Sequence, residues 1–140
     1  KREVIATQKV FSRGGMPMRT IVVVDDEKEM RERYQKLLTS KGFTVIEAPD
    51  AVEMASILLR EKNNIDLILL DINIAEVDGR DIFDIINEYA PSLQVIVSSV
   101  LPVSEQRIRI RRAADYYDKS QKESVLLAKI RNVLGITEEA

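Results

Sequence analysis

Carboxylate, hydroxyl and amine side chains occur at five positions that mostly end short apolar runs: Asp25, Asp26, Asp71, Ser99 and Lys119. An aspartate can attack phosphorus and form an aspartyl phosphate. Neighbouring carboxylates offer the oxygen ligands preferred by Mg²⁺ or Mn²⁺, which offset charge on a transferring phosphoryl group. A lysine adds positive charge, and a hydroxyl can bond a phosphoryl oxygen. Together the five residues are a consistent set for phosphorylation of Asp71.

These residues can meet only if the strands that carry them lie side by side. From residue 20 onward, apolar runs of strand length alternate with amphipathic segments of helix length. The runs predict strands at Thr20–Val24, Thr44–Ala48, Leu67–Leu70, Leu93–Ser98 and around Asp115–Tyr117. Nearly continuous apolar strands are typical of a parallel α/β sheet covered on both faces, whose carboxyl ends share one edge. The alternation leaves the strand order open.

The helical segments have apolar residues spaced to form one face each. We expect these faces to be Met30, Tyr34, Leu37 and Leu38; Val52, Ala55, Leu58 and Leu59; Ile82, Ile85, Ile86 and Tyr89; and Leu126, Leu127, Ile130, Val133 and Leu134. A further helix is predicted near Ser104–Arg112.

Several residues mark where these helices begin and end. Asp50 is predicted to cap the second helix, and Ser120 is predicted to cap the last one in a capping box with Glu123. Lys41-Gly42 and Gly135 are predicted helix stops.

Composition restricts the chemistry further. The 140 residues suffice for one domain, and 45% of them are apolar. The chain has no cysteine and no histidine. Thiol chemistry, imidazole triads and an internal phosphohistidine are therefore excluded, so a histidine donor of phosphate would belong to another protein. A net charge of −2 predicts no general attraction to nucleic acid or to anionic membranes, and no apolar stretch approaches the length of a membrane span.

Four motifs resemble those of the receiver domain of two-component response regulators, in the chemotaxis-Y-like family, from about Arg19 to Gly135. The motifs are Val22-Val23-Val24-Asp25-Asp26-Glu27, Leu67-Ile68-Leu69-Leu70-Asp71 with Asp78-Gly79, Val95-Ile96-Val97-Ser98-Ser99, and Ala114-Asp115-Tyr116-Tyr117-Asp118-Lys119. The resemblance implies a flavodoxin-like five-stranded parallel sheet of order 2-1-3-4-5 with helices on both faces.

The resemblance also implies a role for each site residue. Asp71 is the expected phosphoacceptor, Lys119 the partner of the phosphate, and Ser99 and Tyr116 the switch residues. The expected ligands of Mg²⁺ (or Mn²⁺) are Asp26 directly, Asp25 mostly through water, Asp71 and the backbone carbonyl of Asn73.

By the same resemblance, the phosphoryl donor is a sensor histidine kinase or a histidine phosphotransfer protein. A downstream protein binds the face made by the fourth helix, fifth strand and fifth helix, and phosphorylation can produce a homodimer. We expect a cytoplasmic switch that binds neither nucleic acid nor membrane. It catalyses only its own phosphorylation and dephosphorylation and is not otherwise an enzyme.

The chain departs from the family pattern at four places. The family commonly has proline at the positions of Ala75 and Ser120, and a small residue at the position of Val100. It commonly has Gly-Ala where this chain has Arg112-Ala113. We predict a trans Lys119–Ser120 peptide bond, an altered turn before the fifth strand, and slower phosphorylation and dephosphorylation because Val100 narrows access to Asp71.

Other interpretations of the same residues stay open. Asp25 or Asp26 can simply cap a helix, Asp71 can belong to a turn, and a tyrosine in the last strand can be core packing. The arginines at 107–112 more readily cover a solvated helix side or bind a partner than bind nucleic acid. The main functional alternative is a docking module that keeps the fold without phosphorylation. A phosphohydrolase is disfavoured because Asn73 occupies the place of a second acid.

Three segments are expected: an N-terminal extension or linker at 1–18, the receiver domain at 19–137 and a tail at 138–140. The extension is interpreted as flexible, with an arm that binds a partner as the alternative. We expect no effector domain within this sequence. The start at Lys1, without methionine, hints at a preceding segment.

Overall fold

Five parallel strands form the centre of this computed structural model, which describes residues 18–73 and 78–136. The strands are β1 (Thr20–Val24), β2 (Thr44–Ala48), β3 (Leu67–Asp71), β4 (Gln94–Ser99) and β5 (Asp115–Asp118). Their hydrogen-bonded order is β2-β1-β3-β4-β5, and every neighbouring pair is parallel. The predicted strands and the order implied by the resemblance are therefore confirmed.

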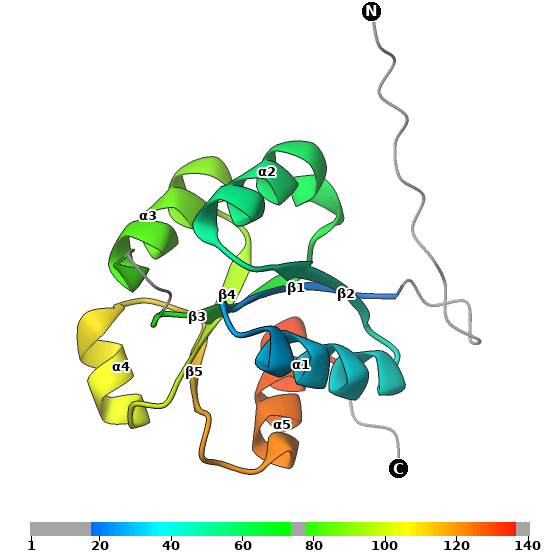
Figure 1. Ribbon diagram of the computed structural model, residues 1–140, viewed down its shortest axis with the longest axis vertical. Helices are drawn as coiled ribbons and strands as arrows, with labels where there is room; N and C mark the ends of the chain where they lie inside the picture. Colours follow the sequence, from blue (N-terminus) through cyan, green and yellow to red (C-terminus); the bar gives the residue numbers. More distant parts are fainter. Residues whose placement is uncertain (1–17, 74–77, 137–140) are drawn as a thin grey trace, which may run out of the picture.

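Helices cover both faces of this sheet (Figure 1). They are α1 (Lys28–Ser40), α2 (Ala51–Glu61), α3 (Gly79–Tyr89), α4 (Val103–Arg109) and α5 (Glu123–Leu134), with a short 3₁₀ turn at Lys62–Asn64. Along β1, Val22 and Val24 pack in one core with α2 and α3, while Ile21 and Val23 pack in the other with α1 and α5. Successive strand residues point to opposite faces, so every central strand must be apolar throughout.

Most predicted helix ends are confirmed. The side chain of Asp50 accepts a hydrogen bond from the backbone N–H of Glu53 at 2.8 Å, as an N-cap does. Gly42 and Gly135 have φ values of 92° and 68°, in the left-handed region that glycine adopts at helix ends.

The predicted apolar face of α2 is wrong at two positions. Val52 and Leu59 are 80% and 73% exposed, whereas Met54, Ile57 and Leu58 are buried. Most positions of this helix are apolar or small, so several faces fit the periodicity. Packing against the sheet and α3 selects the stripe at i, i+3 and i+4.

The predictions for α3 and α4 also need correction. Tyr89 is 45% exposed and is not part of the buried face of α3, which includes Phe83 instead. Helix α4 ends at Arg109, short of the predicted Arg112. Ile110 is buried, and Arg112 has a φ of 68°, so the chain leaves the helix in a tight turn toward β5. Arginine thus adopts a left-handed conformation where the family commonly has glycine.

The predicted capping box at the start of α5 is wrong. Ser120 uses both its backbone N–H and its hydroxyl to bond the Asp118 carboxylate, at 2.8 and 2.7 Å. Helix α5 therefore begins only at Glu123, whose carboxylate accepts a hydrogen bond from Arg33 of α1 at 2.8 Å. The described residues contain no cis peptide bond, so the predicted trans Lys119–Ser120 bond is confirmed.

Some predictions fall on residues outside the described ranges. These are the extension at 1–18 apart from Met18, the tail at 138–140, and Ala75 in the loop after β3. Within the described ranges, no helix combines the length and the apolar character that crossing a membrane requires.

Candidate functional site

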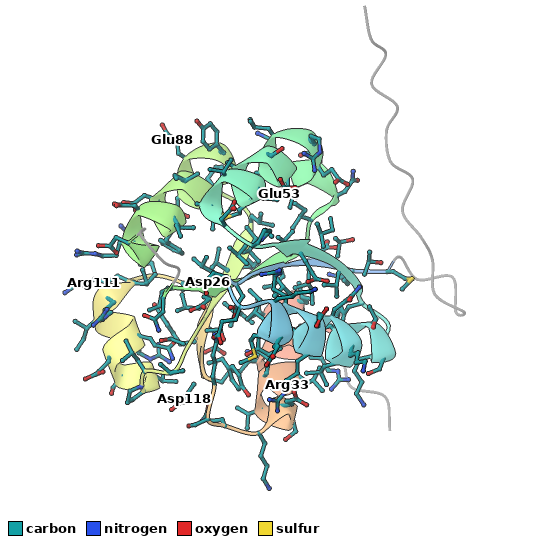
Figure 2. The ribbon with its side chains drawn as sticks, in the orientation of Figure 1. Asp26, Arg33, Glu53, Glu88, Arg111 and Asp118 are labelled. Carbon is teal, nitrogen blue, oxygen red and sulfur yellow. The ribbon has the colours of Figure 1, made fainter. Side chains whose placement is uncertain are left out.

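Three carboxylates meet at the carboxyl ends of β1 and β3. Asp25, Asp26 and Asp71 each offer an oxygen, and these oxygens lie within 4.8 Å of one another. Asp25 and Asp71 are buried, and Asp26 is exposed at the start of the loop into α1 (Figure 2). The carboxylates lie far apart in sequence but adjacent in space because β1 and β3 pair in parallel.

Lys119 lies between the two buried carboxylates. Its Nζ is 3.0 Å from Asp25 Oδ2 and 3.3 Å from Asp71 Oδ2, and its side chain is 6% exposed. Burial works to lower the pKa of Lys119, but Asp71 and Asp25 outweigh it and the pKa is raised. The amine is therefore a permanent cation at this edge of the sheet.

The environment of Asp71 raises the pKa of its carboxyl group. Burial raises the pKa of Asp71 to about 6, against the opposing effects of the Asn73 backbone N–H and the Lys119 ammonium; Asp25 raises it further. One ammonium thus does not fully compensate the buried carboxylates. The site suits a further cation, and its all-oxygen donors fit a hard ion such as Mg²⁺.

Ser99 and Asn73 complete the set. Asn73 donates its backbone N–H to Asp71 Oδ1 at 2.9 Å and its side-chain Nδ2 to Ser99 Oγ at 3.0 Å. Ser99 Oγ also accepts the N–H of Leu101 at 3.1 Å, and its side chain is fully buried. Both contacts use the serine oxygen as acceptor, which leaves its proton available for another acceptor.

Strand pairing sets this geometry. Asp71 lies opposite Ser98 in the β3–β4 register, and the N–H of Lys119 donates to the carbonyl of Ser99 at 2.8 Å. Gly79 starts α3 so close to Ile72 that an added Cβ would lie 2.6 Å from the Cβ of Ile72. A glycine is therefore required here if α3 is to pack directly behind Asp71. All five residues singled out from the sequence meet at one place.

Tyr116 lies apart from this cluster. Its hydroxyl donates to the carbonyl of Ile110 at 2.6 Å and accepts the N–H of Ala113 at 3.2 Å, while Arg107 lies 4.7 Å from its ring centroid. Tyr117 is also buried, in the opposite core. Both tyrosines are packing residues in this structure, and the switch role of Tyr116 stays a prediction.

The helix-cap interpretation of the first aspartates does not account for Asp25. The N-cap residue of α1 is Glu27, and its own side chain makes no capping hydrogen bond. Asp25 Oδ1 instead accepts the backbone N–H of Glu27 at 2.9 Å, before the helix starts.

Two further residues support the site and are not among those predicted from the sequence. Arg31 donates from Nη1 to the carbonyl of Asp25 at 2.8 Å, and its Nε lies 3.3 Å from Glu47. Gln106 is fully buried and joins α4 to the segments that follow Ser99 and precede Lys119. Periodicity gives no signal for either residue, because a polar side chain that donates to backbone carbonyls leaves no apolar pattern in the sequence.

Comparison with known proteins decides the family. Residues 21–131 match the response regulator receiver domain. The chain belongs to this family. Relatives include the transcriptional regulatory proteins YxdJ of Bacillus subtilis and CusR of Escherichia coli, each 29% identical over 116 residues. These alignments cover 82% and 81% of this chain, respectively, and in each case 50% of the relative, so the chain spans about half the length of the curated relatives it matches.

Solved structures of receiver domains have the same fold. A CheY-like receiver domain from Methanospirillum hungatei has a TM-score of 0.75 at 22% identity, covering 84% of this chain and 94% of the other. CheY of Borrelia burgdorferi, solved with CheX, BeF₃ and Mg²⁺, has a TM-score of 0.74 at 26% identity, covering 86% and 91%. This chain therefore has the fold of solved receiver domains.

Proposed function

We propose that this receiver domain is a phosphorylation-activated switch in which Asp71 is the phosphoacceptor. The observation that carries the proposal is the buried Asp71 carboxylate, 3.3 Å from Lys119 and grouped with two further carboxylates. The donor is a phosphohistidine of a sensor kinase or phosphotransfer protein. An oxygen of Asp71 forms the new bond to phosphorus as the P–N bond breaks, and the imidazole leaves with that electron pair.

The other residues bind and orient the phosphoryl group. Asp26, Asp71, the carbonyl of Asn73 and, through water, Asp25 would hold Mg²⁺ or Mn²⁺, which would supply positive charge for the phosphoryl oxygens. Lys119 pairs with one phosphoryl oxygen, and Ser99 donates its free proton to another. No other substrate is turned over, so the chain is a switch rather than an enzyme in the usual sense.

The output follows from the elements next to Ser99 and Lys119. We propose that Tyr116 changes rotamer with Ser99, and that the face of α4, β5 and α5 then changes its preference for a downstream protein or for a second copy of the chain. The domain itself binds no nucleic acid and acts in the cytoplasm, where such kinases transfer phosphate.

Intact-mass spectrometry after incubation with acetyl phosphate and Mg²⁺ tests the proposal. We expect a gain of one phosphoryl group in the wild type, and no gain in Asp71→Asn or without metal. If the wild type stays unmodified under conditions that label another receiver domain, the domain does not phosphorylate itself from small donors. If beryllofluoride with Mg²⁺ also fails to bind, the domain is a docking module that keeps the fold.

A further inference from the structure

Gln106 attaches α4 to the sheet in an unusual way. It is the only buried residue of this helix, and it is polar. Its Nε2 donates to the carbonyl of Leu101 at 2.7 Å and to the carbonyl of Tyr117 at 2.9 Å. A helix on a sheet ordinarily presents an apolar stripe. Here two directional hydrogen bonds replace much of that contact.

Stability alone does not account for this glutamine. Its Oε1 is buried and has no hydrogen-bond partner, the one such side-chain atom in the described part of the chain. A buried acceptor without a donor lowers stability, which an apolar side chain of similar length would avoid. A glutamine at this position therefore points to a role in holding the two carbonyls.

The carbonyls of Leu101 and Tyr117 belong to segments that adjoin the site residues Ser99 and Lys119. Leu101 is two residues beyond Ser99, and its N–H donates to Ser99 Oγ at 3.1 Å. Tyr117 is two residues before Lys119, whose own N–H donates to the carbonyl of Ser99 at 2.8 Å. One carboxamide thus joins α4 to the segments that carry the hydroxyl and the ammonium.

We propose that Gln106 is a positioning residue that holds the Ser99 segment and the end of β5 in their resting arrangement and transmits their displacement to α4. This inference rests on the proposed function. When Ser99 turns to a phosphoryl oxygen on Asp71, the Leu101 N–H loses its acceptor and its peptide is free to move. The Leu101 carbonyl then shifts relative to Nε2, and α4 follows or is released.

Replacement of Gln106 by an apolar residue should lower the stability of the domain but raise its affinity for beryllofluoride. Gln106→Leu removes the unpaired Oε1 but leaves the carbonyls of Leu101 and Tyr117 without this donor, and the loss of two hydrogen bonds outweighs the relief, so the free energy of unfolding falls. The Ser99 segment also loses a restraint against movement, so beryllofluoride with Mg²⁺ binds about three- to tenfold more tightly, the size of effect expected for a residue in a coupling network. A merely structural residue would give unchanged or weaker binding. Val103→Ala, in the same helix and partly buried against the core, is the control and should lower stability without any gain in affinity.

A second measurement uses the wild type alone, because the leucine variant can fail to fold. The side-chain NH₂ of Gln106 in ¹⁵N-labelled protein should be protected from hydrogen exchange at rest. On titration with beryllofluoride and Mg²⁺ it should shift together with the backbone amides of α4, at the same midpoint as the amides of Asp26 and Asn73.

The outcomes are separable. Tighter binding by Gln106→Leu together with a Gln106 amide that shifts with the site supports the inference, and the amide shift decides alone where the leucine variant does not fold. A wild type that binds beryllofluoride while its Gln106 amide does not change overturns the inference and leaves the proposed function intact. A folded leucine variant with unchanged or weaker affinity also overturns it. A wild type that does not bind beryllofluoride at all overturns both.

Discussion

The helices α4 and α5 flank the edge strand β5, yet they are attached to the sheet by different forces. Helix α5 packs through three buried apolar residues, Leu126, Leu127 and Ile130. The only buried side chain of α4 is Gln106, held by two hydrogen bonds. Apolar side chains that fill a close-packed core cannot move without leaving a cavity. A side chain held by two hydrogen bonds can instead exchange these partners for others. The comparison suggests that α5 is a fixed part of the core and that α4 can move.

The largest expected difference is in stability. Leu126→Ala should lower the free energy of unfolding by about 2–5 kcal/mol, because it leaves a cavity in the core. Val103→Ala in α4 is only half-buried and should cost about 1 kcal/mol. Urea unfolding of both variants measures the difference. Equal losses would contradict the distinction between the two helices.

A second prediction concerns Asp71, in the site whose residues Ser99 and Lys119 precede α4 and α5 in the chain. The folded pKa of Asp71 is about 6, above its ordinary value of 3.8, so the folded state binds more protons than the unfolded state between these values. The contribution of Asp71 to stability is therefore fully present below about pH 4 and lost as the pH rises through 6, a change on the order of 2–3 kcal/mol.

Asp71→Asn removes this titration and is the matched variant. The difference in unfolding free energy between metal-free wild type and the variant should fall between pH 4 and pH 7. Added Mg²⁺ should recover part of the loss at pH 7 in the wild type alone. A pH-independent difference would show that Lys119 already compensates Asp71.

A smaller effect is expected at the contact between α4 and β5. Arg107→Ala removes the guanidinium 4.7 Å from the Tyr116 ring centroid and should cost about 0.5–1 kcal/mol. Arg109→Ala, which has no such ring contact among the described residues, should change stability by less than about 0.5 kcal/mol. If the two variants are alike in urea unfolding, the ring contact contributes nothing to the attachment of α4.

A kinetic effect of similarly small size concerns the segment that leads into α4. Val100 directly follows Ser99 and is 70% exposed. Val100→Ala should raise both the rate of phosphorylation by acetyl phosphate and the rate of phosphate loss roughly two- to fivefold, equivalent to about 0.5–1 kcal/mol of activation free energy. Time courses by intact mass measure both rates. No change in either rate would refute the hypothesis that Val100 narrows access to Asp71.

The α4–α5 difference also shows where sequence analysis succeeded and where it failed. The buried stripe at Leu126, Leu127 and Ile130 could be predicted because apolar spacing alone identifies it. The start of α5 could not, since Ser120 fits a capping box equally well until the Asp118 carboxylate is placed beside it. In α4, a glutamine among arginines gives no periodic signal that it is buried.

The sequence by itself determined the strand–helix alternation and the residues of the site. A strand needs only local apolar residues, and an aspartate after such a strand reaches the sheet edge in any parallel arrangement. Tertiary structure alone decided which stripe of α2 is buried, which partner Ser120 takes, that Gln106 spans Leu101 and Tyr117, and that the Asp71 carboxyl has a pKa near 6. These outcomes depend on burial and on which hydrogen-bond partner each polar side chain reaches once the elements have packed, even where that partner is only two or five residues away. Local periodicity contains no information about either.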